Sequence, residues 1–499
     1  MWWKALLGLV AAIIIAFMIM LSQVDATFGI VFHSLFGGDK ETPEESKLQS
    51  RLELPEGFTL GLYAGNIPNA RFIEFSEAGD LLVAQPRYSK VTLIKRDADR
   101  DGHADGEVTL MENLTQPHSI AFQDGYLYIA ESNAVGRVKF DHDAGEIDGE
   151  YERIITGLGD EGNHWSKTIR FGPDKMLYLS SGSTCNVCNE EDAQRATLFR
   201  YEADGTGGEL VAGGLRNAVG FDWNNQGELL ATDNGRDLLG DDYPPCELNK
   251  IEQGKFYGWP QVNGSGDLDP DFGDEAVAAI STSPVHEFRA HNAPLGIRFV
   301  NSDAFPEEYK GAGLVALHGS WNRSTYDGYK VVSLHENGEG GFNERDFLTG
   351  FELDGDIIGR PVDIAQGPDD CVYVSDDFGS AIYRVCFGED QTAASPLTEG
   401  MASAPAFTST GLEGIAPEQL AILSARGEQL FKTRGCIGCH VAGKANARFG
   451  LRPLGGLTEK YDRQSLALFF KSPTPPMPPV RLNSEEDELA LIVYLLSLE

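Results

Sequence analysis

The chain has 499 residues, enough for two or three domains, and its 76 Asp and Glu against 40 Lys and Arg give a formal net charge of −36 at pH 7. This charge argues against a nucleic-acid partner, because nucleic acids are bound through basic surfaces. The 57 glycines and the short apolar runs are typical of an all-β domain with many turns.

Residues 1–22 form an almost wholly apolar N-terminal segment, in which Lys4 is the only charged residue. Its length is close to the roughly 20 residues that span a bilayer as a helix, whereas the apolar part of a cleavable signal peptide has about 7–15. We predict an uncleaved transmembrane anchor, with a removed signal peptide as the alternative. The positive-inside tendency would keep Lys4 in the cytoplasm and export the rest. Residues 23–50, which end in a polar, acidic run, are predicted to be a tether.

A pattern of apolar strands separated by Gly- or Asp-containing turns recurs six times within residues 51–390. The first apolar positions of the copies are Ile73, Ile120, Ile169, Val219, Ile297 and Val362. Repeated four-stranded units of roughly 40–50 residues are the signature of a β-propeller, so six copies predict six blades. Two unrelated β-sandwiches would not produce this periodicity. The strand Phe58–Tyr63 is expected to close the ring with the last blade, and residues 391–416, rich in small residues and proline, are predicted to be a linker.

The residues two positions before each copy share a polar or basic character in five of six cases: they are Arg71, His118, Lys167, Asn217, Leu295 and Arg360. In a propeller these positions meet at one mouth of the central channel. Arg216 and His164 adjoin them, and His291 and Arg323 lie in the corresponding loops of the fifth blade. Each residue alone could be an ordinary solvated loop residue. Together, in a strongly acidic chain, they favour an anionic ligand.

Several segments of the propeller resemble, in order, the soluble PQQ-dependent sugar dehydrogenases, and most closely the sorbosone and pyranose dehydrogenase branch. The segments are Gly162-Asn163-His164, Gly214-Leu215-Arg216-Asn217, Asp233-Asn234-Gly235-Arg236, Glu247-Leu248-Asn249, Tyr257-Gly258-Trp259-Pro260, His318-Gly319-Ser320-Trp321-Asn322-Arg323 and Gly359-Arg360-Pro361-Val362-Asp363. This family is a six-bladed propeller that holds pyrroloquinoline quinone (PQQ), a tricarboxylate, on its axis together with a calcium ion. The resemblance therefore implies the same fold and cofactors here.

The resemblance also assigns catalytic roles. His164 would be the general base that takes the substrate hydroxyl proton while hydride passes to the quinone, a task suited to a neutral imidazole. Arg216 and Arg360 would stabilise the negative charge that develops on the quinone oxygens.

The remaining cofactor contacts follow from the same resemblance. Asn217 matches a PQQ-contacting asparagine, and Arg323 falls where the family places a cation; Arg71 and Lys167 of the basic ring are further candidates. The backbone carbonyls of Gly235 and Arg236 would bind the PQQ calcium, since Ca²⁺ prefers oxygen ligands and would polarise the quinone. Val219 stands where the soluble glucose enzymes have a glutamine, so we expect a different substrate side or fewer PQQ contacts.

An acidic loop in the first blade reads DxDxDGxxD, with its carboxylates at Asp97, Asp99, Asp101 and Asp105. Carboxylates at alternating positions can fold around one Ca²⁺, and Gly102 permits the sharp turn. The loop lacks the terminal Glu of an EF-hand. We predict a structural calcium site rather than a merely acidic turn.

Five cysteines lie in the propeller. Cys185 and Cys188 could be a redox dithiol or a small disulfide, and an exported protein favours a structural disulfide. Cys371 and Cys386 flank one predicted hairpin and can pair across it, which would leave Cys246 unpaired.

Residues 417–499 contain a c-type haem attachment motif, Cys436-Ile437-Gly438-Cys439-His440. The thiols of Cys436 and Cys439 would bind the porphyrin covalently, and His440 would ligate the iron. Met477 lies among prolines that exclude a helix, and its thioether suits the second axial position. Helices are predicted over 417–434 and 485–498. The segment resembles a class I cytochrome c domain; a zinc site would need further ligands, and no cysteine follows the motif.

The predicted fold is thus an all-β six-bladed β-propeller followed by a small all-α cytochrome c domain, with an N-terminal transmembrane helix. We expect a quinohaemoprotein at the periplasmic face of the inner membrane. It would oxidise an aldose, sorbosone-like or related sugar at PQQ and pass electrons through haem c to a further cytochrome or the respiratory chain. Two alternatives remain: a calcium-dependent lactonase-type propeller, which would need carboxylate ligands on the axis, and a non-catalytic docking propeller that presents the haem.

Overall fold

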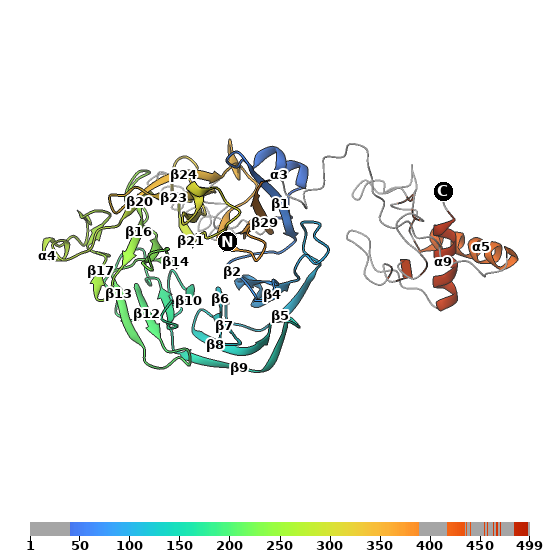
Figure 1. Cartoon of the computed structure of the whole chain (residues 1–499), viewed down its shortest axis with the longest axis horizontal. Helices are drawn as coiled ribbons and strands as arrows, with labels where there is room; N and C mark the ends of the chain where they lie inside the picture. Colours follow the sequence, from blue (N-terminus) through green and yellow to red (C-terminus); the bar gives the residue numbers. More distant parts are fainter. Residues whose placement is uncertain are drawn as a thin grey trace, which may run out of the picture. The chain divides into compact units, whose positions relative to one another are not determined.

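The computed structural model describes residues 40–388, 417–434 and 484–497, and the single residues 436, 440, 454, 457, 463, 466, 467 and 470 (Figure 1). The chain divides into two compact units, Met1–Ala394 and Ser395–Glu499. The predicted anchor, residues 1–22, and the predicted linker, residues 391–416, lie outside the described residues. Among the described residues, no helix combines the length and the apolar character needed to cross a membrane.

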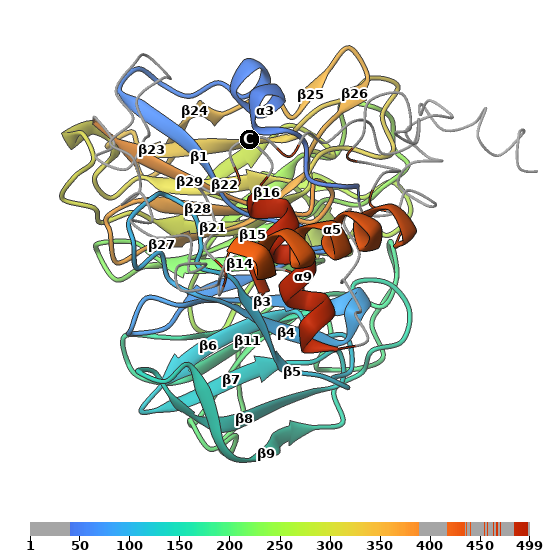
Figure 2. The same cartoon turned by 90° about the vertical axis from the view of Figure 1, so that its right-hand side faces the viewer.

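Six sheets of mainly antiparallel strands are arranged as the blades of a propeller, which confirms the prediction from the repeats (Figure 1). The first blade contains β2 (Ile73–Phe75), β3 (Leu81–Gln85), β4 (Lys90–Ile94) and β5 (Glu107–Met111). The second contains β6 (Ser119–Gln123), β7 (Tyr126–Ala130), β8 (Ala134–Asp141) and β9 (Glu146–Thr156). The third contains β10 (Lys167–Phe171), β11 (Leu177–Ser181), β12 (Thr197–Tyr201), β13 (Glu209–Gly213) and β17 (Lys255–Phe256). In Figure 2, β6 to β9 follow one another outward from the axis.

The last three blades complete the ring. The fourth blade contains β14 (Ala218–Trp223), β15 (Leu229–Asp233), β16 (Cys246–Ile251) and β20 (His286–Phe288). The fifth contains β21 (Pro294–Phe299), β22 (Gly313–Leu317), β23 (Lys330–Glu336) and β24 (Phe342–Leu348). The sixth contains β27 (Pro361–Gln366), β28 (Val372–Asp376), β29 (Ala381–Phe387) and β1 (Phe58–Gly65). The smaller elements of the propeller unit are η1 (Pro86–Tyr88), η2 (Glu307–Tyr309), α4 (Glu275–Ala278), the strand pair β18 (Val262–Asn263) and β19 (Asp267–Leu268), and the pair β25 (Glu352–Leu353) and β26 (Asp356–Ile357).

The second strands of the blades are buried at every position in β3, β15, β22 and β28. Neighbouring blades cover both of their faces, which explains why these strands are short continuous apolar runs in the sequence. As predicted, β1 closes the ring by pairing with β29, with Phe58 opposite Phe387. The Phe58 ring also packs edge-on against Phe305, Tyr309 and Phe347, with ring centroids 4.9–5.1 Å away.

Residues 40–50, which we predicted as part of the tether, instead pack on the propeller. The backbone N–H of Lys40 donates to the carbonyl of Phe378 at 2.8 Å, and Thr42 Oγ1 donates to the carbonyl of Ser380 at 2.9 Å. The helix α3 (Glu45–Arg51) buries Leu48 in the core of the fifth and sixth blades. The segment was predicted as a tether because it is polar overall, and Leu48 is the single apolar side chain that attaches its helix to the propeller core.

Charged side chains from several innermost strands meet inside the channel. Arg298 of β21 donates through Nη2 to Glu74 Oε2 of β2 at 2.9 Å. Arg170 of β10 lies between two carboxylates: its Nη1 is 3.8 Å from Asp222 Oδ1 of β14 and 3.9 Å from Glu74 Oε2. On β27, Asp363 accepts the Ile73 N–H at 3.1 Å, and burial raises its pKa to about 6. These contacts tie strands of different blades together.

Replacing Arg298 by methionine is expected to lower the free energy of unfolding by about 1–3 kcal/mol, because it removes the closest cation from Glu74 and leaves it only Arg170, at 3.9 Å. Denaturation by urea measures this loss. The control is Arg345→Met, which breaks the exposed pair with Glu308 and should cost about 0–1 kcal/mol. A loss for Arg298→Met as small as that of the control would show that the channel pairs do not hold the blades.

In the C-terminal unit, the two predicted helices are present as α5 (Pro417–Thr433) and α9 (Glu485–Leu496). Leu423 packs with Ala490 and Val493. A Cβ on Gly427 would lie 2.0 Å from the carbonyl oxygen of Ala490, so the close approach of the helices requires glycine.

Candidate active site

The residues predicted to ring one mouth of the channel all lie at the start of an innermost strand. Arg71 precedes β2, His118 precedes β6, and Asn217 precedes β14. Lys167 opens β10, Leu295 lies near the start of β21, and Arg360 precedes β27. The sequence register of the repeats therefore placed these positions correctly at one end of the strands.

His164 lies in the loop before β10 with a left-handed backbone, φ 49°. Its Nδ1 is 3.1 Å from the carbonyl oxygen of Ser183 and 2.9 Å from Ser183 Oγ. A carbonyl only accepts, so Nδ1 carries the proton and Nε2 offers a lone pair. Burial, followed by the nearby Arg216 cation, lowers the pKa of His164 to about 3. The imidazole is therefore neutral and able to accept a proton.

Gly182, just after β11, lets two predicted site residues approach each other. A Cβ on Gly182 would lie 2.5 Å from Asn217 Oδ1 and 2.6 Å from His164 Cβ. Both distances are shorter than non-bonded contacts allow, so only glycine permits His164 and Asn217 to converge here. The sequence predicted both residues but gave no reason to single out the glycine.

Arg216 is 3% exposed and is held by several acceptors. Its Nε donates to the carbonyl of Asn186, and its Nη2 donates to Asn186 Oδ1 and Asp237 Oδ2, all at 2.9 Å; Nη1 donates to the carbonyl of Asn234 at 3.1 Å. Asp233, another residue that we had not assigned a role, accepts the backbone N–H groups of Arg216 and Asn217. The cation beside His164 is thus rigidly positioned.

A second group of charges lies between the first and sixth blades. Arg71 Nη1 donates to Asp377 Oδ2 at 2.8 Å, and Asp377 Oδ1 lies 2.8 Å from His318 Nε2. On its other side, Arg71 Nη2 is 3.4 Å from His118 Nε2. Burial, then the Arg360 cation, lowers the pKa of His318 to about 4, and burial lowers that of His118. Asp377 therefore offsets part of the positive charge of the basic ring. The sequence gave no sign that an aspartate would lie among these cations.

Arg360 is partly exposed at the same mouth. Its Nε donates to the carbonyl of His318 at 3.0 Å and its Nη2 to that of Gly319 at 2.9 Å. Its guanidinium carbon lies 5.5 Å from the centroid of the Tyr329 ring. Carbonyl partners leave the full positive charge of Arg360 in place.

Two other predicted cations are used within the protein. Lys167 Nζ donates to the carbonyls of Gly159 and Trp165, both at 2.9 Å, and burial lowers its pKa to about 7. Arg323 forms an ion pair with Asp242 at 3.2 Å and donates hydrogen bonds to the carbonyls of Asp241 and Ala290. Arg323 belongs to the fifth blade, so these bonds tie that blade to the loop after β15. Their bonds give both residues a positioning role in the loops around the mouth.

Val219 belongs to an apolar cluster from four blades, together with Phe72, Leu295 and Val362. Phe72 follows Arg71 directly, and Val219 and Val362 lie two residues after Asn217 and Arg360, so the cluster adjoins the basic ring. Leu295, the one apolar member of the predicted ring, is explained by this cluster.

The loop that follows β15 contains the predicted calcium carbonyls. No hydrogen-bond donor among the described residues contacts the carbonyl oxygens of Gly235 or Arg236, while the Arg236 side chain turns away to Asp269 at 2.7 Å. Free carbonyl oxygens in a fixed loop suit a hard cation. Nearby, Asp233 of β15 lies opposite Glu247 of β16, and burial raises their pKa values to about 7 and about 8.

The acidic loop between β4 and β5 brings three of its four predicted carboxylates together. Ligand oxygens of Asp97, Asp99 and Asp105 lie within 4.8 Å of one another. The fourth, Asp101, accepts the His103 N–H at 2.8 Å. The backbone N–H of Gly102 donates to Asp97 Oδ2 at 2.9 Å, as expected for a sharp turn around the carboxylates.

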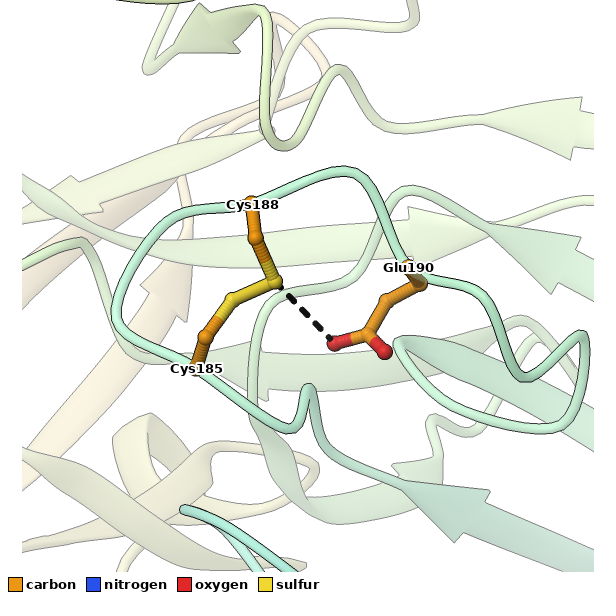
Figure 3. Close-up of side chains that lie close together, drawn as sticks. All are labelled: Cys185, Cys188 and Glu190. Atoms are coloured by element: carbon orange, nitrogen blue, oxygen red, sulfur yellow. Dashed lines mark hydrogen bonds between the residues drawn. A yellow bond between two sulfur atoms is a disulfide. The ribbon is translucent and has the colours of Figure 1, made fainter.

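Both predicted disulfides are present, Cys185–Cys188 and Cys371–Cys386, and Cys246 is a buried free thiol (Figure 3 shows the first pair). In the haem motif, the His440 N–H donates to the carbonyl of Cys436 at 3.1 Å, as in one turn of helix. Cys439 and Met477 lie outside the described residues.

Comparison with known proteins bears on the propeller. A family model described as TrAA12-like matches residues 52–262 and 266–385. An uncharacterized protein from Borreliella burgdorferi is 30% identical over 358 residues, which cover 68% of this chain and 92% of that protein. An aldose sugar dehydrogenase from Escherichia coli is 29% identical over 238 residues, which cover 44% of this chain and only 58% of that relative.

Among solved structures, the holo form of the pyranose dehydrogenase PQQ domain from Coprinopsis cinerea has a TM-score of 0.60 and 18% identity, and the match covers 67% of this chain and 97% of that one. At this identity the structural likeness shows the fold alone. The family match, by contrast, extends through all six blades. The chain therefore belongs to the TrAA12-like family.

Proposed function

We propose that the propeller oxidises an aldose, sorbosone-like or related sugar with PQQ and calcium as cofactors. One observation carries the proposal: at the basic mouth of the propeller, His164 is a neutral imidazole beside the buried Arg216 cation, and its Nε2 has no hydrogen-bond partner among the described residues. The names of the Escherichia coli and Coprinopsis cinerea relatives support a sugar substrate and, for the second, PQQ.

The residues present fit an anionic, planar cofactor with a calcium ion. Guanidinium groups from three blades, Arg71, Arg216 and Arg360, suit its carboxylates and quinone oxygens. The carbonyl oxygens of Gly235 and Arg236 would hold the ion. When bound, PQQ would supply the two-electron acceptor. His164 Nε2 would take the hydroxyl proton of the sugar, while Arg216 and Arg360 offset the negative charge that develops opposite it.

The proposal extends to the C-terminal unit, as a cytochrome c domain that holds haem c through Cys436, Cys439, His440 and Met477. Fusion of the two units in one chain would raise the effective concentration of the electron acceptor. With residues 1–22 as a membrane anchor, the enzyme would act at the periplasmic face and reduce a further cytochrome or the respiratory chain.

The experiment is a titration of the purified protein with PQQ and Ca²⁺, followed by a panel of aldoses with a dye as electron acceptor. We expect dye reduction that requires PQQ, Ca²⁺ and one class of sugar, and that EDTA abolishes. Bound PQQ without dye reduction by any sugar would contradict a dehydrogenase. Hydrolysis of a lactone by the same preparation would instead support the lactonase-type alternative.

The pH dependence of kcat/KM gives a separate prediction. Because the pKa of His164 is lowered to about 3, the imidazole stays unprotonated as the pH falls from 8 to 5, and kcat/KM should show no acid limb from this residue. An ordinary histidine, with a pKa near ~6.5, would be about 97% protonated at pH 5. A decline in the pH–rate profile centred near 6.5, with the protein still folded, would contradict the assignment.

Calcium is also predicted to stabilise the first blade through Asp97, Asp99 and Asp105. Adding Ca²⁺ to the EDTA-treated protein should raise the unfolding temperature by a few degrees, because a ligand that binds the folded state stabilises it. Asp99→Asn should reduce this gain, whereas Asp143→Asn, in an exposed turn between β8 and β9, should not. An equal response to Ca²⁺ in both variants would show that the loop binds no calcium.

A further inference from the structure

The loop after β11 is closed on itself by the Cys185–Cys188 disulfide (Figure 3). Glu190 folds back over it and accepts hydrogen bonds from the Thr184 N–H at 2.5 Å and from Thr184 Oγ1 at 3.0 Å. Its Oε1 lies 3.9 Å from Cys188 Sγ. The disulfide sulfur carries no proton, so in the oxidised protein this is a packing contact.

Asn186, between the two cysteines, contacts two parts of the candidate active site. Its carbonyl oxygen and its Oδ1 each accept a hydrogen bond from Arg216 at 2.9 Å. Its Oδ1 also accepts the Asp237 N–H at 2.8 Å, and its Nδ2 donates to the Asp237 carbonyl at 3.1 Å. One residue thus fixes both Arg216 and the loop that carries Gly235 and Arg236.

The same loop contacts the proposed base. Ser183, which accepts from His164 Nδ1, donates through its Oγ to the Cys185 carbonyl at 2.8 Å. The Asn163 N–H donates to the Thr184 carbonyl at 2.7 Å. Arg216 is therefore bonded to a residue inside the disulfide loop, and His164 to Ser183, which is itself bonded to Cys185 at the start of that loop.

We propose that the Cys185–Cys188 disulfide is a redox-sensitive clamp on this site, with Asn186 as the positioning residue through which it acts on Arg216. The inference rests on the proposed function. Reduction by an external dithiol would transfer two electrons and two protons, break the S–S bond, form two thiols and leave the reductant as its own disulfide. The freed Cys188 thiol could then donate to Glu190, in competition with Thr184.

Accessibility distinguishes this disulfide from the other one. Cys185 and Cys188 are partly exposed, whereas Cys371 and Cys386 are only 5% and 6% exposed and belong to the core between the first and sixth blades. A reductant should therefore reach Cys185–Cys188 first. The second pair also provides a matched control, because its removal alters two cysteines without touching Asn186.

The test compares the double variants Cys185→Ser, Cys188→Ser and Cys371→Ser, Cys386→Ser as full-length proteins. For the first, we expect Kd for PQQ to rise about tenfold, equivalent to ~1.4 kcal/mol, and kcat to fall. In the protein without PQQ, hydrogen exchange at the Asp237 amide should become faster. Asn186→Ala should reproduce these changes with the disulfide intact, and the control pair should leave PQQ affinity and exchange unchanged.

Wild-type protein treated with a dithiol, freed of it under anaerobic conditions and then loaded with PQQ should match the first variant. An unchanged Kd, kcat and exchange rate in that variant would overturn the clamp. The clamp would also be overturned if both double variants lost PQQ affinity and kcat equally, with matching falls in unfolding temperature. The disulfides would then be merely structural. If the wild type binds no PQQ, the proposed function fails, and exchange at Asp237 alone decides the clamp.

Discussion

Replacing His164 by glutamine is expected to lower kcat for sugar oxidation by about 10²–10⁴-fold. Glutamine can still contact Ser183, but it has no lone pair able to take a proton at the position of Nε2. The measurement is dye-linked turnover at saturating PQQ, Ca²⁺ and sugar. PQQ affinity should change little, since the charges that suit the cofactor come from the arginines.

The matched control is His142→Gln, in a turn between β8 and β9, where His142 Nδ1 accepts the Glu77 N–H. Its kcat should equal that of the wild type. A His164→Gln variant with kcat within a few-fold of the wild type would exclude His164 as the base. Loss of PQQ binding instead of turnover would show that His164 holds the cofactor.

Removing the haem attachment cysteines should abolish electron delivery while leaving sugar oxidation intact. We expect the double variant Cys436→Ser, Cys439→Ser to lose covalent haem and with it all sugar-dependent reduction of an external cytochrome. Reduction of a small dye directly at the propeller should persist, because the base and the arginines belong to the other compact unit. Parallel assays with the two acceptors measure this split.

The control is again Cys371→Ser, Cys386→Ser, which removes two cysteines and keeps the haem motif. It should reduce both acceptors. Cytochrome reduction that survives loss of the motif would place the haem outside the electron path. A wild-type protein that shows no haem absorption would contradict the cytochrome prediction itself.

The propeller could be predicted because each innermost strand repeats the same apolar pattern, with gaps near fifty residues between the first four copies and longer insertions between the later ones. The closing strand Phe58–Tyr63 followed from the same pattern. Residues 40–50 were predicted wrongly as tether, since their attachment depends on one buried leucine, Leu48, and on backbone hydrogen bonds such as that from Lys40 to Phe378. Neither feature leaves a periodic signal in the sequence.

The candidate site was predictable where residues within one loop act together, as for Arg216 and Asn217. Partners from different blades were missed: Asp377 meets Arg71 only because β1 closes the ring and brings the first and sixth blades together. Lys167 was read as part of an open basic ring, but the carbonyls that hold its ammonium belong to a loop whose path the sequence does not show. The position of Asn186 between two cysteines was the one available signal for the clamp.

In the proposed function, sugar oxidised at the propeller delivers electrons to a haem on the same chain. The most direct measurement mixes the oxidised, PQQ- and Ca²⁺-loaded protein with each sugar under anaerobic conditions and follows the haem absorption. We expect haem reduction that needs both PQQ and one class of sugar and that disappears in His164→Gln. Haem that stays oxidised with every sugar, in a protein that has bound PQQ, would contradict it.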